Sequence, residues 1–175
     1  MNKDQILIRK IGIYLDMGQG TVLTMDSQKD VDRIIDAAVE EKMDAYKIIK
    51  IDMLKMTTLQ DISDSIVYQI NIFLNEHDKV EEFYDKKDDY GYLCHALELP
   101  EKISKTINTK VIFVINELEH AVDFDIDFKV LEVMRSIFQY QHNAIHVFTG
   151  TSKTLMKNVF HDRHAPFFRF ATEVG

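Results

Sequence analysis

Apolar and polar positions along the chain follow two patterns, a helical stripe and a short continuous apolar run. Residues 4–15 carry apolar side chains at the spacing of one helix face, and the run ends before Gly18. The strongest strand signal is residues 111–115 (VIFVI), apolar at every position, as expected for a strand covered on both faces. By the same criteria we predict helices over residues 28–42, 57–76, 100–108, 125–142 and 152–160, and strands over 21–25, 46–51 and 145–149.

Several of these boundaries coincide with residues that begin helices. Ser27 and Ser152 are suitable N-caps for the second and the last helix, because a serine hydroxyl can accept a hydrogen bond from a free N–H group of the first turn. Pro100 suits the first position of a short helix that ends near Asn108. The tail, residues 166–174, is apolar enough to form a fifth strand or to dock against the core.

The order of these segments predicts the fold class. Strands and helices follow one another in turn, and this order requires right-handed crossovers between parallel strands. We therefore predict an α/β fold of three layers, with a mostly parallel sheet of four or five strands. No repeat or linker divides the chain, so residues 1–175 are expected to form a single domain. Residues 76–90, with seven acids and three bases, are expected to be a solvated excursion.

Composition narrows the class of protein. The 175 residues include 21 Lys and Arg against 29 Asp and Glu, a formal net charge of −8 with His neutral. Because Lys and Arg supply most non-specific affinity for phosphates, direct contact with nucleic acid is not expected. No apolar run approaches the ~20 residues that cross a bilayer, so no membrane contact is expected. The single cysteine, Cys94, excludes an internal disulfide and fits a reducing cytoplasm.

Four short motifs in a fixed order carry a resemblance to a known family. They are Asn116-Glu117, Arg135-Ser136, Thr149-Gly150-Thr151-Ser152 and Pro166-Phe167-Phe168-Arg169. With these motifs, residues 21–171 resemble the archaeal-type ATPases of the AAA+/STAND group of P-loop proteins. The resemblance implies a P-loop NTPase-like domain in which the residues at the strand ends face a nucleotide.

The chain departs from that family at the phosphate-binding loop. An active member carries G-x-x-x-x-G-K-[ST] after its first strand, and the glycines let backbone N–H groups approach the phosphates. Here no glycine occurs between Gly20 and Gly91. Asp26, Asp30 and Asp32 would face and repel an incoming triphosphate. We therefore expect the Walker A loop to be lost and no cofactor to be bound, with ATP and Mg²⁺ as the alternative.

The resemblance assigns roles to three residues at strand ends. Glu117 takes the position of the Walker B glutamate that polarises the attacking water, so it is the candidate catalytic residue, vestigial without a phosphate loop. Asn116 replaces the aspartate that orients the Mg²⁺ shell, and Thr149 matches a polar sensor of the γ-phosphate. Both are candidate cofactor-binding residues, although an ordinary strand-to-helix turn is the simpler explanation of Thr149. The chain reaches Gly175 before the small helical lid of AAA+ proteins, so either it is a fragment or the lid is absent; for this domain we expect no C-terminal lid.

No metal site is predicted. Asp52 and Glu117 would both lie at the carboxyl ends of parallel strands, where α/β proteins bind ligands. Two carboxylates from separate elements are nevertheless a weak indication of a divalent cation. His161 and His164 beside Asp162 lack a third ligand, so a solvated turn is favoured over a metal cluster.

These observations lead to one favoured function and two alternatives. The favoured one is a degenerate P-loop ATPase-like domain that no longer hydrolyses nucleotide and acts as a protein-interaction or regulatory module, with a protein or a second copy of the chain as partner. A decayed remnant without selected activity gives the same signal. The first alternative is an ATPase that binds Mg·ATP through a non-standard loop, with Glu117 as general base. The second is a subunit of a DNA-associated system, because many members of the family serve such systems.

Overall fold

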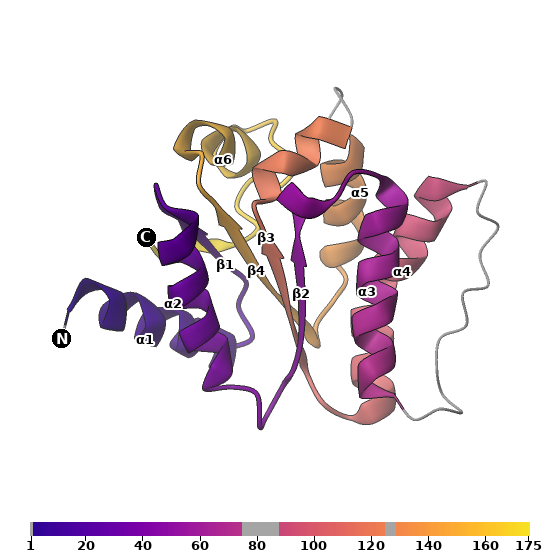
Figure 1. Cartoon of the computed structure of the whole chain (residues 1–175), viewed down its shortest axis with the longest axis horizontal. Helices are drawn as coiled ribbons and strands as arrows, with labels where there is room; N and C mark the ends of the chain where they lie inside the picture. The colour runs from indigo at the N-terminus through magenta and orange to yellow at the C-terminus, as the bar shows by residue number, and fades with distance from the viewer. Residues whose placement is uncertain (1, 75–87, 125–128) are drawn as a thin grey trace.

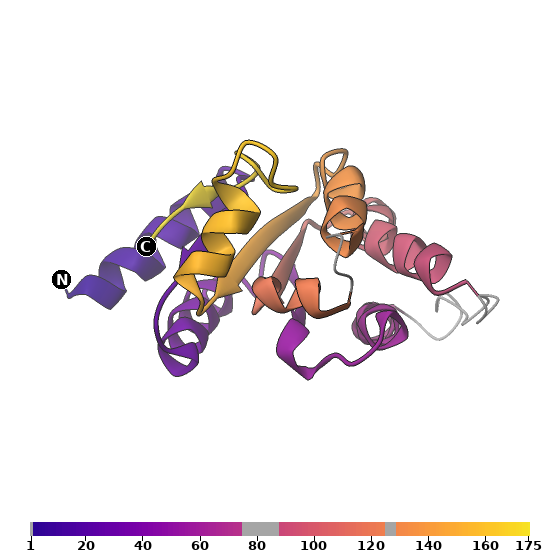
Figure 2. The same ribbon diagram turned by 90° about the horizontal axis from the view of Figure 1, so that it is seen from above.

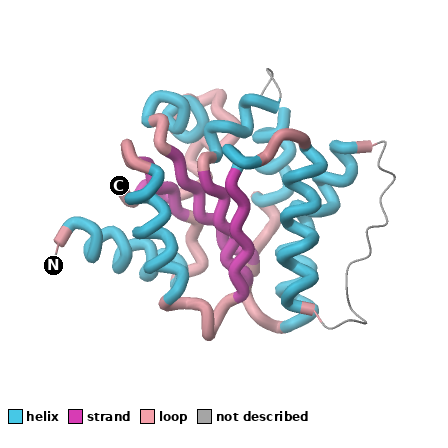
Figure 3. Tube along the Cα trace, viewed as in Figure 1, coloured by secondary structure: helices cyan, strands magenta, loops and turns pink. Residues whose placement is uncertain are grey.

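The computed structural model describes residues 2–74, 88–124 and 129–175. Within them, one sheet of five parallel strands has the order β2–β3–β4–β1–β5 (Figures 1 and 3). The strands are β1 (Thr21–Thr24), β2 (Lys47–Asp52), β3 (Val111–Asn116), β4 (Ala144–Gly150) and β5 (Thr172–Glu173). The predicted α/β class, with a parallel sheet of four or five strands, is confirmed.

Helices cover both faces of the sheet, as the three-layer prediction requires (Figures 1 and 2). One face is covered by α1 (Lys3–Asp16) and α2 (Gln28–Glu40). The other is covered by α3 (Leu59–Phe73), α4 (Asp89–Ile107), α5 (Lys129–Phe138) and α6 (Lys153–Phe160). Because side chains alternate along a strand, β3 contributes Ile112 to the first core and Phe113 to the second. None of the helices described is long and apolar enough to cross a membrane.

The prediction of a short helix beginning at Pro100 is wrong, because Pro100 lies inside α4 and is buried there. Proline lacks the N–H group that a helix interior uses, so it disturbs the hydrogen bonds of the preceding turn. In that turn the carbonyl of Leu97 accepts a hydrogen bond of 2.7 Å from Nε2 of Gln141. The carbonyl that loses its helical N–H partner at Pro100 is that of Ala96, four residues earlier. The Gln141 bond holds the next carbonyl of the same turn, and α4 continues through the proline.

The helix predicted over residues 125–142 ends earlier than expected, since α5 stops at Phe138. Glu101 of α4 accepts hydrogen bonds of 2.7–3.1 Å from three successive backbone N–H groups, those of residues 142–144. These bonds turn the chain into β4 instead of letting the helix continue. The start of this predicted helix, and most of the predicted solvated excursion, lie outside the described residues.

The tail combines the two structures that its sequence left open. Phe167 is fully buried, with its ring centroid 5.1 Å from that of Phe148 and 5.6 Å from that of Phe160. Five residues later, β5 pairs with β1 in parallel. The segment therefore docks through its phenylalanines and then adds the edge strand of the sheet.

Candidate functional site

The carboxyl ends of β1, β3 and β4 bring the predicted site residues to one edge of the sheet. Asn116 ends β3, where it is in register with Asp52 of β2, and Thr149 of β4 is in register with Leu23 of β1. From this edge β1 leads into α2 on one face, while β4 leads into α6 on the other. Such a switch point is where open α/β sheets bind their ligands. Glu117 follows directly after β3, so the three candidate residues of the sequence lie at this one end of the sheet.

A chain of hydrogen bonds joins Thr149 to α2. Thr149 Oγ1 donates to Asn116 Oδ1 at 3.0 Å, and Asn116 Nδ2 donates to Asp32 Oδ1 at 3.3 Å. The same Asp32 oxygen accepts from Nε2 of Gln28 at 2.9 Å and lies 4.0 Å from Nζ of Lys50. Both polar atoms of the buried Asn116 side chain are thus used within the protein. An aspartate at position 116 would place a second carboxylate against that of Asp32.

Glu117 makes different contacts, although it is the next residue. Its Oε2 accepts a hydrogen bond of 2.9 Å from Thr151 Oγ1, and its Oε1 is buried without a hydrogen-bond partner among the described residues. Its backbone φ is +53°, in the left-handed region that residues other than glycine rarely adopt. Burial raises the pKa of Glu117, and the nearby Glu119 carboxylate adds to this, against the opposing effect of the Thr151 hydrogen bond.

Glu119 is a site residue that sequence reasoning missed. It lies in the 3₁₀ helix η2 (Leu118–Phe124), is buried, and accepts hydrogen bonds of 2.7 Å from the backbone N–H groups of Thr151 and Ser152. Free N–H groups at the start of a helix attract anions. Here the carboxylate of the chain itself takes the N–H groups at the start of α6. The one signal in the sequence is a second glutamate two residues after Glu117.

The connection between β1 and α2 is only three residues long, 25–27. Ser27 Oγ caps α2 by accepting from the N–H of Asp30 at 3.4 Å, as its sequence position predicts. The hydrogen bond from Arg33, and then that from Ser27, lowers the pKa of Asp30, which keeps this carboxylate charged at the helix start. A P-loop surrounds phosphates with successive backbone N–H groups. A three-residue connection with Asp26 inside it does not fit the phosphates of a nucleotide in that way.

A polar cleft of about 330 Å³ opens beside this edge. It is lined by Asp32, Lys50, Ile51, Asp52, Lys55, Met56, Ser65 and Asn116. Its charges are paired: Lys50 Nζ lies 2.7 Å from Asp36 Oδ1, and Lys55 Nζ lies 3.0 Å from Asp52 Oδ2. The cleft therefore offers no uncompensated charge to a nucleotide phosphate.

The histidine and carboxylate pairs singled out in the sequence have ordinary partners. His161 Nε2 lies 3.1 Å from Glu173 Oε2, and Asp162 Oδ1 accepts from the backbone N–H of His164 at 2.8 Å. Asp52 caps the short 3₁₀ helix η1 (Met53–Lys55). In the part of the chain that the structure describes, no three His, Cys, Asp or Glu side chains are grouped so as to hold a metal ion.

Comparisons with known proteins identify the fold. No family model matches the sequence, and no curated protein matches it. The Walker-type ATPase of Pyrococcus abyssi is similar in structure, with a TM-score of 0.69 and 15% identity over 96% of this chain and 51% of that one. Orc1 of Aeropyrum pernix, solved in complex with DNA, has a TM-score of 0.63 and 12% identity, over 100% of this chain and 46% of that one. Cdc6 of Pyrobaculum aerophilum has a TM-score of 0.62 and 12% identity, over 98% of this chain and 44% of that one.

These likenesses confirm the P-loop NTPase-like fold and, at the level of fold, the resemblance to archaeal Walker-type ATPases. At 12–15% identity they show the fold alone. The chain spans about half the length of the proteins that it resembles.

Proposed function

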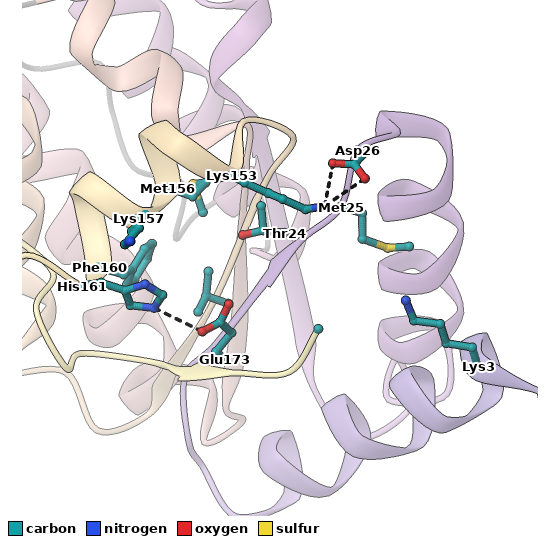
Figure 4. A pocket seen from close by; sticks show the side chains of 12 residues that line it. Lys3, Thr24, Met25, Asp26, Lys153, Met156, Lys157, Phe160, His161 and Glu173 are labelled. Carbon is teal, nitrogen blue, oxygen red and sulfur yellow. Dashed lines mark hydrogen bonds and ion pairs between the residues drawn. The ribbon is translucent and has the colours of Figure 1, made fainter.

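We propose that this chain is a degenerate P-loop ATPase-like domain that does not hydrolyse nucleotide and serves as a protein-interaction or regulatory module in the cytoplasm. The observation that carries this proposal is the three-residue connection between β1 and α2. It contains Asp26 and ends in Ser27, whose side chain already takes the Asp30 N–H group. A phosphate approaching this turn would meet Asp26 in an ion pair with Lys153 (Figure 4), where a P-loop presents successive backbone N–H groups and a lysine free to bind the phosphate.

The hydrogen bond between Asn116 of β3 and Asp32 of α2 supports the same proposal. The strand-end position that carries an aspartate in the family is Asn116, and the carboxylate nearby belongs to Asp32 of α2. Asp32 is held by Gln28, Asn116 and Lys50, and the amide oxygen of Asn116 is held by Thr149. The Asp32 oxygen and both polar atoms of Asn116 are already engaged in this network, so a Mg²⁺ ion would have to displace those hydrogen bonds in order to bind them. Among the described residues, Oε1 of Gln28 is buried without a hydrogen-bond partner.

One observation favours the alternative, an ATPase with Glu117 as general base. Burial raises the pKa of Glu117, as expected for a general base that works near neutral pH. Its unpartnered Oε1 is also the atom that would accept a proton. A base nevertheless acts only on a water held beside a phosphate, and the residues at the end of β1 do not fit that phosphate.

Replacing Glu117 with glutamine separates the two functions. The purified wild type and Glu117→Gln are both expected to release phosphate from ATP at the rate of buffer alone. We also expect the variant to melt at the same or a higher temperature. Because the raised pKa means that folding disfavours the carboxylate, the native protein loses stability as pH rises from the unfolded pKa through the folded one. The advantage of the variant should therefore be larger at pH 7 than at pH 4. Hydrolysis by the wild type that Glu117→Gln abolishes would establish the ATPase instead.

We further propose that the chain forms a single domain and that its partner is a protein or a second copy of the chain. Three large apolar side chains of α1 and its C-cap residue are 47–61% exposed: Ile6, Ile13 and Met17. Their spacing of seven and four residues places them on one face of the helix, opposite to the face that packs on the sheet. An exposed apolar stripe of this kind suits contact with another protein.

For nucleic acid we propose no direct contact by this domain. The similar Orc1 structure is a complex with DNA, but this chain carries a net charge of −8. Titration of a labelled 20-base-pair duplex, followed by fluorescence anisotropy at about 150 mM salt, should give a Kd weaker than about 100 µM, the weak end of non-specific binding. A Kd near 1 µM that weakens steeply with added salt would mean that a local basic surface overrides the net charge.

A further inference from the structure

The outer edge of β2 is the longer of the two edges of the sheet. β2 has six residues and stands at one end of the strand order, whereas β5 at the other end has two. The N–H of Lys47 donates to the carbonyl of Lys110, just before β3, at 3.0 Å. Because the backbone groups of successive strand residues point to opposite sides, residues 47, 49 and 51 bond to β3, and residues 48, 50 and 52 turn their N–H and C=O groups outward. An outward row of this kind can pair with another strand.

One side chain of α3 occupies the middle of this row. The helix runs beside β2 (Figure 1), and Gln69 reaches from it to the backbone of Lys50. Gln69 Oε1 accepts a hydrogen bond of 2.8 Å from the N–H of Lys50, and Gln69 Nε2 donates one of 2.7 Å to the carbonyl of the same residue. In an antiparallel ladder, a residue exchanges these same two bonds with the residue opposite. The amide of Gln69 therefore takes the place of one residue of a neighbouring strand.

Contacts on either side keep Gln69 at the edge. Its Nε2 also lies 3.3 Å from the carbonyl oxygen and 3.3 Å from Oγ of Ser65, one turn earlier in α3. One turn later, the ring centroid of Phe73 lies 5.9 Å from Nζ of Lys47. At the far end of the row, Asp52 caps η1. Of the three outward positions in β2, residue 48 is thus the one that remains, which is too little for a second strand to form a ladder.

We propose that Gln69 closes the edge of β2 and so prevents a second copy of the chain from pairing with it. The edge is complementary to itself: about a two-fold axis, residues 48 and 50 of one copy would face residues 50 and 48 of the other in antiparallel pairing. The charge of Lys50 would not oppose this pairing, because its Nζ lies 2.7 Å from Oδ1 of Asp36. The inference concerns β2 and α3 alone, so it does not depend on whether the β1–α2 connection holds a nucleotide.

Gln69→Asn and Gln69→Met should each open the edge, for different reasons. Asparagine keeps the amide but is one methylene too short to reach Lys50, and methionine keeps the length but has no N–H or C=O group. In sedimentation velocity over a range of concentrations, both should self-associate about 10-fold more strongly than the wild type, because a partner no longer has to displace two hydrogen bonds on each copy. The matched control is Gln60→Met, nine residues earlier in the first turn of α3, which should sediment like the wild type.

Adding Ile48→Pro to Gln69→Asn distinguishes edge pairing from a general loss of stability. The N–H of Ile48 points away from β3, so proline removes a donor of the outer edge without removing a bond of the sheet. The double variant should sediment like the wild type. Two results would overturn the inference: Gln69 variants that sediment like the wild type, or a folded double variant that associates as strongly as Gln69→Asn.

Hydrogen exchange of Gln69→Asn alone decides the question if the double variant does not fold. In the variant diluted to the species that the wild type forms, the N–H of Lys50 should exchange at least about 10-fold faster than in the wild type, because its acceptor is gone. At concentrations where the variant associates further, exchange at Lys50 should slow again. An exchange rate at Lys50 that does not depend on concentration would overturn the inference.

Discussion

Glu119→Ala is expected to lower the free energy of unfolding by about 2–3 kcal/mol. The Glu119 carboxylate accepts two hydrogen bonds of 2.7 Å from the N–H groups of Thr151 and Ser152, in the turn from β4 to α6. Alanine leaves both groups without an acceptor and opens a cavity beside Met156. For a domain of this size the melting temperature should fall by roughly 5–10 °C in a thermal denaturation followed by circular dichroism.

Glu98→Ala is the matched control for this variant. Glu98 is exposed, and its contact with Lys102 is a surface ion pair within one helix. Such pairs contribute about 0.3–0.5 kcal/mol, so the melting temperature should change by no more than about 2 °C. If Glu119→Ala and Glu98→Ala had the same melting temperature, the turn would not depend on the carboxylate of Glu119, and our account of this turn would be wrong.

Gly150→Ala is expected to cost about 1–3 kcal/mol, as overpacked sites do. A β-carbon at Gly150 would lie 2.6 Å from Cγ and Sδ of Met156, and it would contact Oε2 of Glu119. Met156 is buried and the other carboxylate oxygen of Glu119 is held by two hydrogen bonds, so neither neighbour moves freely. Chemical denaturation should therefore show a lower midpoint with an unchanged slope.

Gly12→Ala provides the opposite expectation for the same substitution. Gly12 lies in α1, and the nearest atom to a β-carbon there is Cε of Lys42 at 3.7 Å, an ordinary contact. Alanine should stabilise this helix by about 0.5–1 kcal/mol.

The double variant Glu119→Ala/Gly150→Ala adds a second check on the Gly150 prediction, because removing the Glu119 carboxylate removes one of the clashes. Its cost should be smaller than the sum of the two single costs; strict additivity would mean that the two side chains are not coupled.

The residues at the strand ends were predictable because parallel strands impose a simple geometry. Each apolar run had to lie in the sheet with its carboxyl end at the same edge, so Asn116, Thr149 and Asp52 had to gather there. The cap of α2 was predictable for a similar local reason, since a serine before an amphipathic stretch can satisfy the first turn. The cap depends on residues close in sequence, and the gathering of the strand ends follows from the shared direction of the parallel strands and not from one particular distant contact.

The predictions that failed depend on side chains distant in sequence. Pro100 lies inside a helix whose turn before the proline is held by Gln141 through the carbonyl of Leu97, and α5 ends before residues 142–144, whose N–H groups donate to Glu101. Glu119 was missed for the same reason, since its hydrogen-bond donors are the backbone N–H groups of Thr151 and Ser152, more than thirty residues later in the chain. No local pattern of hydrophobic and polar residues records such contacts.

The central claim is that the turn after β1 binds no nucleotide, and the melting temperature with and without about 1 mM Mg·ATP, Mg·ADP and Mg·GTP tests it most directly. A ligand present at 100 times its Kd stabilises by about 2.7 kcal/mol, a rise of roughly 5–10 °C for this chain length. We predict that none of the three nucleotides changes the melting temperature by more than about 1 °C. A rise of several degrees with any of the three would show that the domain binds a nucleotide and would contradict the account.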